Sequence, residues 1–133
     1  MAKITLSNIG HSYNQDKDQS TWALKPLDMV WESGKTYALL GPSGCGKTTI
    51  LNTISGLVTP FQGKLLFDDK DVTNIPTAQR NIAQVFQFPT IYKSMSVFEN
   101  LAFPLVCRGW QADKIKARVN EIAEILEITD KLG

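Results

Sequence analysis

Hydrophobic and polar residues alternate along two stretches near the start of the chain, residues 3–9 and 27–31. A period of two is typical of a strand with one buried face. Residues 64–67 resume a strand-like pattern and lead into a turn at 68–71, whereas residues 14–21 are polar throughout and indicate an exposed loop. The pattern therefore predicts strands that belong to an antiparallel sheet.

Two other stretches, residues 36–40 and 82–87, are mostly apolar and do not alternate. Short runs of this kind are typical of strands that are covered on both faces. We expect both to be buried strands of a parallel core, with the antiparallel strands flanking it. This arrangement belongs to the α/β fold class.

Helical spacing appears in three places. Residues 48–55 carry Ile50, Leu51 and Ile54, and Gly56 provides a natural stop. Residues 97–106 are compatible with a helix that Pro104 should interrupt.

The third helical stretch, residues 111–126, is amphipathic. Its apolar stripe consists of Ile115, Val119, Ile122 and Leu126. We expect this stripe to pack into a core rather than to bind a partner.

Composition limits the possible functions. With 133 residues, 43% of them hydrophobic, the chain can form one compact domain and is short for two. The net charge is +1, and the one basic cluster, over residues 114–118, indicates a solvated helix face rather than a nucleic-acid site. No apolar run approaches the roughly 20 residues of a membrane-spanning helix, and no signal-peptide core is present. We expect a cytoplasmic protein without a nucleic-acid partner.

The cysteines and the histidine do not indicate a metal site. Cys45 and Cys107 lie far apart in the sequence and are expected to be free thiols in a reducing compartment. His11 has no Cys or His neighbour at ligand spacing, which argues against a structural metal site.

The strongest chemical signal is residues 41–49, Gly-Pro-Ser-Gly-Cys-Gly-Lys-Thr-Thr, which fit the phosphate-loop pattern G-x-x-x-x-G-K-[ST]. Backbone N–H groups and the positive end of a helix dipole hold phosphates in such a loop. Gly41, Gly44 and Gly46 allow the backbone to approach the ligand closely. The alternative, a plain glycine turn before a helix, is disfavoured by the predicted strand and helix on either side.

Particular residues of this loop have distinct expected roles. Lys47 places an ammonium beside the β- and γ-phosphates of a nucleoside triphosphate, and the Thr48 hydroxyl is a suitable Mg²⁺ ligand. Thr49 can add one more donor, and Ser43 and Cys45 complete the nucleotide-binding loop. We also expect Cys45, at a helix start beside Lys47, to react with alkylating reagents unless nucleotide covers it.

Five stretches together resemble the ATP-binding subunits of ABC transporters, and the likeness covers nearly the whole chain. They are residues 41–49, 54–57, 63–71, 82–87 and 96–101. Within that family, residues 81–109 look most like the subunits of bacterial importers for sugars and polyols, glycerol-type systems included. The resemblance implies a partial P-loop NTPase (RecA-like) core with a flanking antiparallel sheet over residues 1–87. It also implies the beginning of a helical subdomain over residues 88–133.

The resemblance assigns further site residues. Tyr13 lies where the family places an aromatic ring that stacks on adenine, with Trp22 as the alternative; in a third interpretation Tyr13 merely covers core. Gln87 matches the Q-loop glutamine, whose amide oxygen reaches Mg²⁺ or the attacking water. Lys47 and Gln87 are then the catalytic candidates, and Thr48 and Gln87 the metal ligands.

The resemblance also implies partners. Residues 88–99, with Pro89, Ile91, Tyr92 and Met95, would dock on transmembrane permease subunits, although simple burial of these side chains is an equal alternative. A second ATP-binding subunit would complete the dimer. The chain would then be peripheral at the inner face of the cell membrane.

The sequence lacks four segments that hydrolysis requires in this family: the LSGGQ-type signature, the Asp that ends an apolar strand, the Glu after it and a late His. It therefore looks like the N-terminal portion of a subunit that binds Mg-ATP and has little turnover alone. We expect uncovered apolar surface to cause dimerisation, strand exchange or poor solubility.

Three other functions stay open. The first is a non-catalytic nucleotide-binding or self-associating module. The second is a GTPase or small-molecule kinase, which the absence of an N-K-x-D segment disfavours. The third is a soluble ABC ATPase of nucleic-acid repair, against which the near-neutral charge argues weakly.

Overall fold

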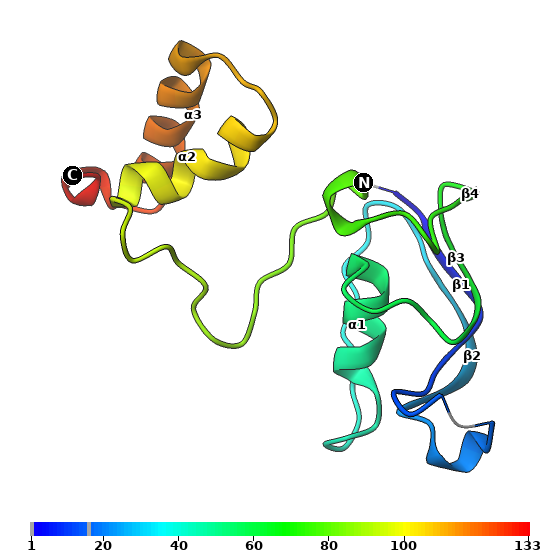
Figure 1. The fold of residues 1–133 in the computed structure, drawn as a ribbon. Helices are drawn as coiled ribbons and strands as arrows, with labels where there is room; N and C mark the ends of the chain where they lie inside the picture. Colours follow the sequence, from blue (N-terminus) through cyan, green and yellow to red (C-terminus); the bar gives the residue numbers. More distant parts are fainter. Residues whose placement is uncertain (1, 16) are drawn as a thin grey trace. The chain divides into compact units, whose positions relative to one another are not determined.

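The computed structural model describes residues 2–15 and 17–133, so residue 16 of the loop expected over 14–21 lies outside the described residues. The chain forms two compact units, Met1–Val85 and Phe86–Gly133 (Figure 1). Among the described residues, the first contains the sheet and one α-helix, and the second contains two α-helices.

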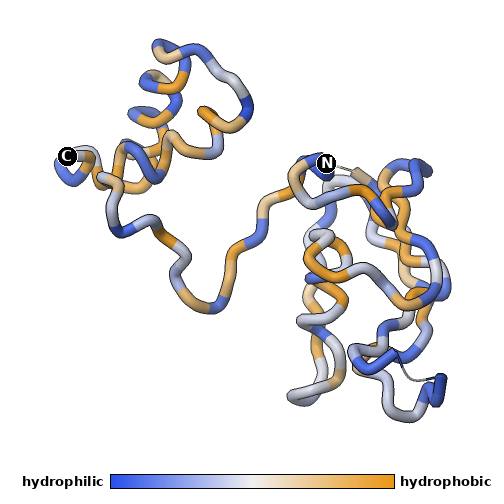
Figure 2. Tube along the Cα trace, viewed as in Figure 1, coloured by the Kyte–Doolittle hydropathy of each residue, from blue (hydrophilic) through white to orange (hydrophobic). Residues whose placement is uncertain are grey.

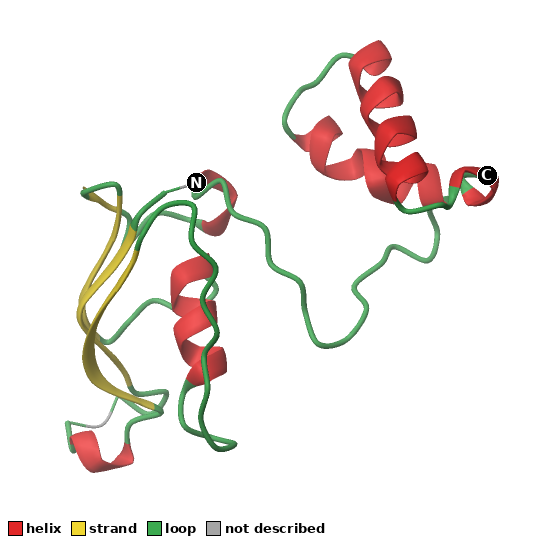
Figure 3. Ribbon diagram, turned by 180° about the vertical axis from the view of Figure 1, so that it is seen from behind, coloured by secondary structure: helices red, strands yellow, loops and turns green. Residues whose placement is uncertain are grey.

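The first unit has a four-stranded sheet in the order β2-β1-β3-β4. Its strands are β1 (Ile4–His11), β2 (Leu24–Trp31), β3 (Gln62–Phe67) and β4 (Lys70–Asp71), and all three pairings are antiparallel. A short 3₁₀ helix, η1 (Gln19–Thr21), precedes β2. The antiparallel sheet predicted from the alternating pattern is confirmed (Figure 3).

A bulge in β1 aligns the two largest core residues of that strand. The register shifts between Leu6 and Ile9, and Asn8 between them has a positive φ of 50°. One extra residue in a strand changes which side chains share a face. Leu6 and Ile9, three positions apart, are therefore both buried, at 1% and 0% exposure.

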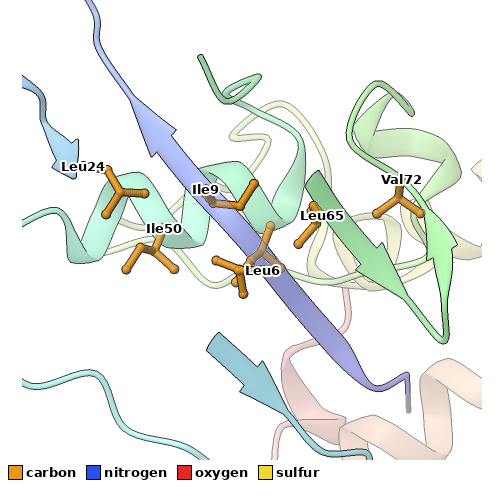
Figure 4. Close-up of a cluster of buried hydrophobic side chains, with 7 residues drawn as sticks. Leu6, Ile9, Leu24, Ile50, Leu65 and Val72 are labelled. Atoms are coloured by element: carbon orange, nitrogen blue, oxygen red, sulfur yellow. The ribbon is translucent and has the colours of Figure 1, made fainter. Parts of the chain in front are cut away.

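Helix α1 (Lys47–Ser55) packs on one face of this sheet (Figures 1 and 3). Ile50 and Ile54 face the strands, and Gly56 ends the helix with a left-handed φ of 82°, as the sequence predicts. Figure 4 shows Ile50 of the helix beside Leu6 and Ile9 of β1. The buried cluster consists of Leu6, Ile9, Leu24, Ile50, Ile54, Leu65 and Val72.

The β3–β4 turn is a tight hairpin. Asp68 and Asp69 both have positive φ, 47° and 65°, as the two central residues of a type I′ turn require. The Asp68 carboxylate accepts a hydrogen bond of 2.7 Å from the Lys3 N–H. A 3₁₀ helix, η2 (Thr77–Gln79), follows the hairpin.

The two buried strands predicted at residues 36–40 and 82–87 are not formed. Leu40 is 92% exposed and Val85 is 97% exposed. A strand covered on both faces needs a hydrogen-bonded neighbour, and neither run has one among the described residues. Both stretches stay extended, and Figure 2 shows hydrophobic residues along the segment that follows η2.

The second unit consists of α2 (Val97–Cys107), α3 (Ala112–Ile125) and a 3₁₀ helix, η3 (Thr129–Lys131). Ser96 and Glu99 form a capping box at the start of α2. The helix continues past Pro104 to Cys107, so the interruption predicted there is wrong. Pro104 removes one backbone hydrogen bond, and packing of the surrounding turns against α3 keeps the helix intact.

Helix α3 buries Ile115, Val119 and Ala123. Ile122 is half-buried, and Leu126, which we expected on the apolar stripe, is 55% exposed. Because the helix ends at Ile125, Leu126 occupies the C-cap and leaves the stripe. The small residue Ala123 takes the buried position instead.

Candidate functional site

The loop that leads into α1 contains two glycines in the left-handed region, Gly44 (φ 79°) and Gly46 (φ 93°). A Cβ on Gly46 would lie 2.8 Å from the carbonyl oxygen of Ala23, too close for any side chain. Gly46 therefore meets two demands, the backbone angle and the close approach to the residue before β2. Gly44 has open space around it, so only its φ requires glycine.

A cavity of about 340 Å³ lies at the start of α1. Its lining consists of Ala23, Ser43, Gly44, Gly46, Lys47, Thr48 and Thr49. Gly46 is the N-cap residue, and no side chain caps the helix there. The N–H groups of the first turn, with the positive end of the helix dipole, can therefore serve an anion.

The Lys47 ammonium lies across the loop. Its Nζ donates to the carbonyl oxygens of Gly41 (2.7 Å) and Pro42 (2.6 Å) and lies 3.5 Å from the Cys45 Sγ. These acceptors are neutral. A phosphate oxygen would replace them with a charged acceptor, which makes a stronger hydrogen bond.

The two threonines of the loop differ in their surroundings. Thr48 is exposed, and its residue lines the cavity next to Lys47. Thr49 is only 6% exposed, and its hydroxyl lies 3.4 Å from the hydroxyl of Tyr13. Thr49 therefore joins the end of β1 to the first turn of α1.

Tyr13 is 61% exposed, and its ring packs edge-on against His11 with centroids 4.5 Å apart. Through Thr49 it lies beside the phosphate loop, and its stacking on adenine stays a prediction. Trp22, the alternative stacking residue, is 7% exposed and packs against Phe61. A Cβ on Gly10 would lie 2.6 Å from the Trp22 ring, so this ring is enclosed and presents no face to a ligand.

Gln87 and residues 88–99 belong to the second unit. Gln87 is exposed, and so are Phe88 (76%), Ile91 (65%) and Tyr92 (52%). The structure thus brings together Tyr13 and the residues of the loop 41–49, while the roles of Gln87 stay predictions.

One residue organises the turn before α2, and the sequence did not single it out. The Asn100 side chain accepts a hydrogen bond from the Tyr92 N–H (2.9 Å) and donates to the carbonyls of Tyr92, Met95 and Ser96 (3.0, 3.1 and 2.9 Å). The Tyr92 ring also contacts Phe103, with centroids 4.9 Å apart. A lone Asn near a helix start gives no signal for such a network.

Beside this turn, α2 and α3 enclose a largely apolar groove of about 640 Å³. It is lined by Met95, Phe98, Glu99, Ala102, Phe103, Val106, Ala112, Ile115 and Lys116. We call it the α2–α3 groove.

A second residue that the sequence did not single out is Arg80. Its side chain is 6% exposed and donates hydrogen bonds to backbone carbonyls near the far end of α1. Only its position, four residues after Pro76 and without an acidic neighbour, distinguishes it in the sequence.

Within the described part of the chain, no three His, Cys, Asp or Glu residues are placed to hold a metal ion. No helix of that part is long and apolar enough to cross a membrane.

The loop, the cavity at the start of α1 and the Lys47 ammonium have the arrangement of a P-loop. The family model described as "ABC transporter" matches residues 24–132. The chain therefore belongs to the ABC transporter ATP-binding family, as the sequence resemblance implies.

Similar proteins are import ATP-binding proteins. The chain is 38% identical over 128 residues to the sn-glycerol-3-phosphate import ATP-binding protein UgpC of Bordetella avium, with 96% of this chain and 34% of that protein covered. It is 37% identical to the glucose import ATP-binding protein GlcV of Saccharolobus solfataricus, over 96% of this chain and 37% of that protein. The chain thus spans about a third of the length of these relatives.

A third relative has another solute in its name. The sulfate/thiosulfate import ATP-binding protein CysA of Thermosynechococcus vestitus is 41% identical, with 95% of this chain and 36% of that protein covered. Among solved structures, MJ1267, an ATP-binding cassette of an ABC transporter, superposes with a TM-score of 0.77 at 25% identity. That match covers 99% of this chain and 56% of MJ1267.

Proposed function

We propose that this chain binds Mg-ATP as the nucleotide-binding part of an ABC-type import ATPase. The observation that carries the proposal is the cavity at the start of α1, where Lys47, Thr48 and uncapped first-turn N–H groups meet. An ammonium, a hydroxyl and the N–H groups at the positive end of a helix dipole can all donate hydrogen bonds to a polyphosphate at one point.

Different side chains bind different parts of the nucleotide. Lys47 leaves the carbonyls of Gly41 and Pro42 and binds the β- and γ-phosphates. The Tyr13 ring, which is exposed and is held by His11 and Thr49, stacks on adenine. Stacking of a base on an aromatic ring contributes about 1–3 kcal/mol.

Mg²⁺ would bind at this site together with the phosphates. The Thr48 residue lines the cavity beside Lys47 and offers a hydroxyl ligand. Since no cluster of His, Cys, Asp or Glu is placed to hold a metal among the described residues, most other ligands would be phosphate oxygens and water. Bound Mg²⁺ supplies neutralisation of the charge on the phosphates, and Gln87 is the proposed second protein ligand.

We further propose a place for the chain in an import system. The relatives named above act in the import of glycerol-3-phosphate, glucose and sulfate or thiosulfate, and we assign this chain to a sugar or polyol importer. The exposed apolar residues of 88–99 are the proposed contact with permease subunits at the inner membrane face. A second ATP-binding subunit would pair with this one.

The second candidate is a nucleotide-binding or self-associating module without turnover of its own. It is favoured by the two extended runs at 36–40 and 82–87, which expose Leu40 and Val85 and lack partner strands in the described part of the chain. Unpaired extended backbone is a template for association with another copy.

Calorimetric titration with Mg-ATP tests the nucleotide site. We expect Lys47→Ala to weaken binding by at least about a hundredfold, which corresponds to roughly 2.7 kcal/mol. Lys70→Ala, in the exposed strand β4, is the matched control and should bind as the unmodified chain does. If the unmodified chain binds no Mg-ATP, or if Lys47→Ala binds equally well, the proposal is wrong.

Two further measurements separate the candidates. Phosphate release under saturating Mg-ATP reports turnover, and sedimentation reports association. Turnover would exclude the second candidate. Binding without turnover by a chain that stays monomeric supports the nucleotide-binding part of an ATPase, whereas binding without turnover combined with self-association supports the second candidate.

A further inference from the structure

The far end of α1 is held by a residue that lies outside the nucleotide cavity. We propose that Arg80 is a positioning residue for nucleotide binding, because its buried guanidinium fixes the helix whose first residue is Lys47. This inference rests on the proposed function, since it concerns the same site.

The guanidinium joins two segments of backbone, the end of α1 and residues 73–75. Nη1 donates to the carbonyls of Thr53 (2.8 Å) and Ile54 (3.0 Å) in the last turn of α1. Nε donates to Ile75 (2.7 Å), and Nη2 donates to Thr73 (3.1 Å). Arg80 thus fastens α1 to the segment that follows β4.

The positive charge of Arg80 stabilises the C-terminal end of α1. The last carbonyls of a helix have no partner within it, and the dipole makes that end negative. The last turn of α1 contains no basic residue of its own. Arg80 therefore supplies, from 26 residues beyond Ile54, the cation that stabilises this terminus.

Burial makes these contacts obligatory. Arg80 is 6% exposed, and within the described residues no carboxylate forms an ion pair with it. Burial lowers the pKa of the guanidinium, which stays cationic because an arginine is not deprotonated in proteins. Four backbone carbonyls accept its hydrogen bonds in the described part of the chain, so displacement of α1 would leave donors and acceptors unpaired.

Gly56 shows how closely the guanidinium packs against the helix end. A Cβ at this position would lie 2.7 Å from Arg80 Nε and 2.8 Å from its Cζ. Gly56 also has a φ of 82° and donates its N–H to the Thr53 carbonyl, which Arg80 shares. The helix end is therefore built around the guanidinium.

A second bond holds the same helix from the same segment. Gln84 Nε2 donates to Asn52 Oδ1 in α1 at 3.2 Å. Arg80 and Gln84 precede Gln87 by seven and three residues. The segment that anchors α1 thus leads directly to the proposed Q-loop glutamine.

The geometry of a short helix connects this anchor with the ligand. Helix α1 has nine residues, a length of roughly 13 Å at 1.5 Å per residue. Over that distance a rigid helix transmits a shift at Ile54 to Lys47 and Thr48 with little loss. Removal of the Arg80 bonds should therefore misplace the ammonium and the hydroxyl that meet the phosphates.

The test compares Arg80→Gln with Met29→Ala in the full chain. Met29 lies on the edge strand β2 and packs against the core, whereas the acceptors of Arg80 lie in α1 and residues 73–75. Both changes should lower stability. After correction for the folded fraction, we expect Mg-ATP to bind Arg80→Gln about tenfold more weakly, and Met29→Ala with unchanged affinity.

A more conservative variant covers the case in which Arg80→Gln does not fold. Arg80→Lys keeps the charge but loses the planar guanidinium that reaches several carbonyls. We therefore expect it to lose affinity for Mg-ATP, but less than Arg80→Gln does. Unchanged affinity in a folded Arg80 variant overturns the proposal, and so does an equal loss in Met29→Ala. If neither Arg80 variant folds, the role is structural and the proposal is also overturned.

Amide hydrogen exchange without nucleotide separates this inference from the proposed function. Arg80→Gln should accelerate exchange over residues 44–49, and Met29→Ala should not. If the unmodified chain binds no Mg-ATP while this difference persists, the nucleotide assignment fails and the positioning of the loop by Arg80 stands. If the difference is absent, the positioning inference fails whatever the chain binds.

Discussion

The two units of the chain differ in the size of their buried hydrophobic clusters. In Met1–Val85, strands and a helix contribute to a buried cluster of seven residues, and the candidate site lies at one end of that helix. In Phe86–Gly133 the buried cluster has three residues, and α2 and α3 leave an apolar groove of about 640 Å³ open.

This difference follows from what each unit is proposed to bind. A phosphate site needs N–H groups, an ammonium and a hydroxyl at fixed positions, and a packed core behind α1 provides that rigidity. A protein-docking face needs apolar surface that the unit itself leaves uncovered. Phe88, Ile91 and Tyr92 of the same unit are exposed, and Tyr92 contacts Phe103 of the groove, which meets that need.

The largest expected effect breaks the core of the first unit. Leu65 is 0% exposed, and Leu65→Ala should lower the free energy of unfolding of that unit by about 2–5 kcal/mol, because a cavity replaces its side chain. Val119, 1% exposed in the second unit, loses only two methyl groups on change to Ala, so Val119→Ala should cost about 1–2 kcal/mol.

Hydrogen exchange resolved by residue measures each loss within its own unit. A cost for Val119→Ala equal to or above that of Leu65→Ala would show that the second unit is packed as firmly as the first. The contrast between the two units would then be wrong.

The next effect compares a cysteine in each unit. Cys45 and Cys107 are both exposed free thiols. Cys45 lies in the phosphate loop, 3.5 Å from Lys47 Nζ, whereas Cys107 ends α2. At a nucleotide concentration of about 100 Kd, Mg-ATP should slow alkylation of Cys45 by about a hundredfold, since only the free chain reacts.

Cys107 serves as the control in the same tube, because nucleotide should leave its rate unchanged. Mass spectrometry of the labelled peptides measures both rates. Equal slowing of the two cysteines would indicate a general change in the chain, and no slowing of Cys45 would place nucleotide elsewhere.

Sequence patterns predicted the first unit unevenly, and the errors have a physical origin. Alternation identified β1 and β2 because one buried face per strand is a local property. The apolar runs at 36–40 and 82–87 have the composition of buried strands, but a strand exists only with a partner to receive its hydrogen bonds. No local pattern reports whether such a partner is present.

In the candidate site, too, the residues of a local motif could be predicted, whereas residues that act through distant contacts could not. The phosphate loop was predictable because glycine conformation, a lysine and a helix start act within nine residues of sequence. Arg80 was not, since its acceptors at Thr53 and Ile54 lie 27 and 26 residues away. Asn100 was missed because its bonds depend on the turn at 92–96, which has no distinctive sequence.

A smaller effect is expected from replacing two glycines that have similar backbone angles, one of them at the end of α1. Gly34 has φ 74° and open space within 4 Å of where a Cβ would lie, whereas at Gly56, with φ 82°, a Cβ would lie 2.7 Å from Arg80 Nε. Gly34→Ala should cost about 1 kcal/mol of stability from backbone conformation alone. Gly56→Ala should cost more, up to about 3 kcal/mol, because the guanidinium must also move.

Urea denaturation of the two variants measures this difference. Equal costs would mean that Arg80 yields easily to the added methyl group. In that case the guanidinium would be a weak anchor for α1.

The smallest expected effect concerns the stability of the first unit at acidic pH. Asp71 Oδ1 accepts hydrogen bonds from the Thr73 hydroxyl (2.6 Å) and the Thr73 N–H (2.9 Å), and these bonds lower the pKa of Asp71 below its ordinary value of 3.8. The same Thr73 hydroxyl accepts from the Leu65 N–H, and the Thr73 carbonyl accepts from Arg80. The carboxylate therefore orders the segment that holds the end of α1.

The sign of the pH effect follows from that direction. Because the pKa of Asp71 is lower in the folded chain than in the unfolded chain, the ionised carboxylate adds stability that is fully present above pH 3.8. The contribution is lost as the pH falls from there through the folded pKa. Asp71→Asn should lower the stability of the first unit at neutral pH and should flatten its decline in acid relative to the unmodified chain. Bonds from Ser20 also lower the pKa of Asp18, so part of the acid sensitivity should survive in Asp71→Asn.

Denaturation of both chains at a series of pH values checks this prediction, with Asp69→Asn in the β3–β4 turn as the control. The Asp69 carboxylate takes no part in the Thr73 bonds, so that variant should keep the slope of the unmodified chain. Parallel curves for Asp71→Asn and the unmodified chain would show that Thr73 is held without the carboxylate. The support of Arg80 would then rest on the backbone of residues 73–75 alone.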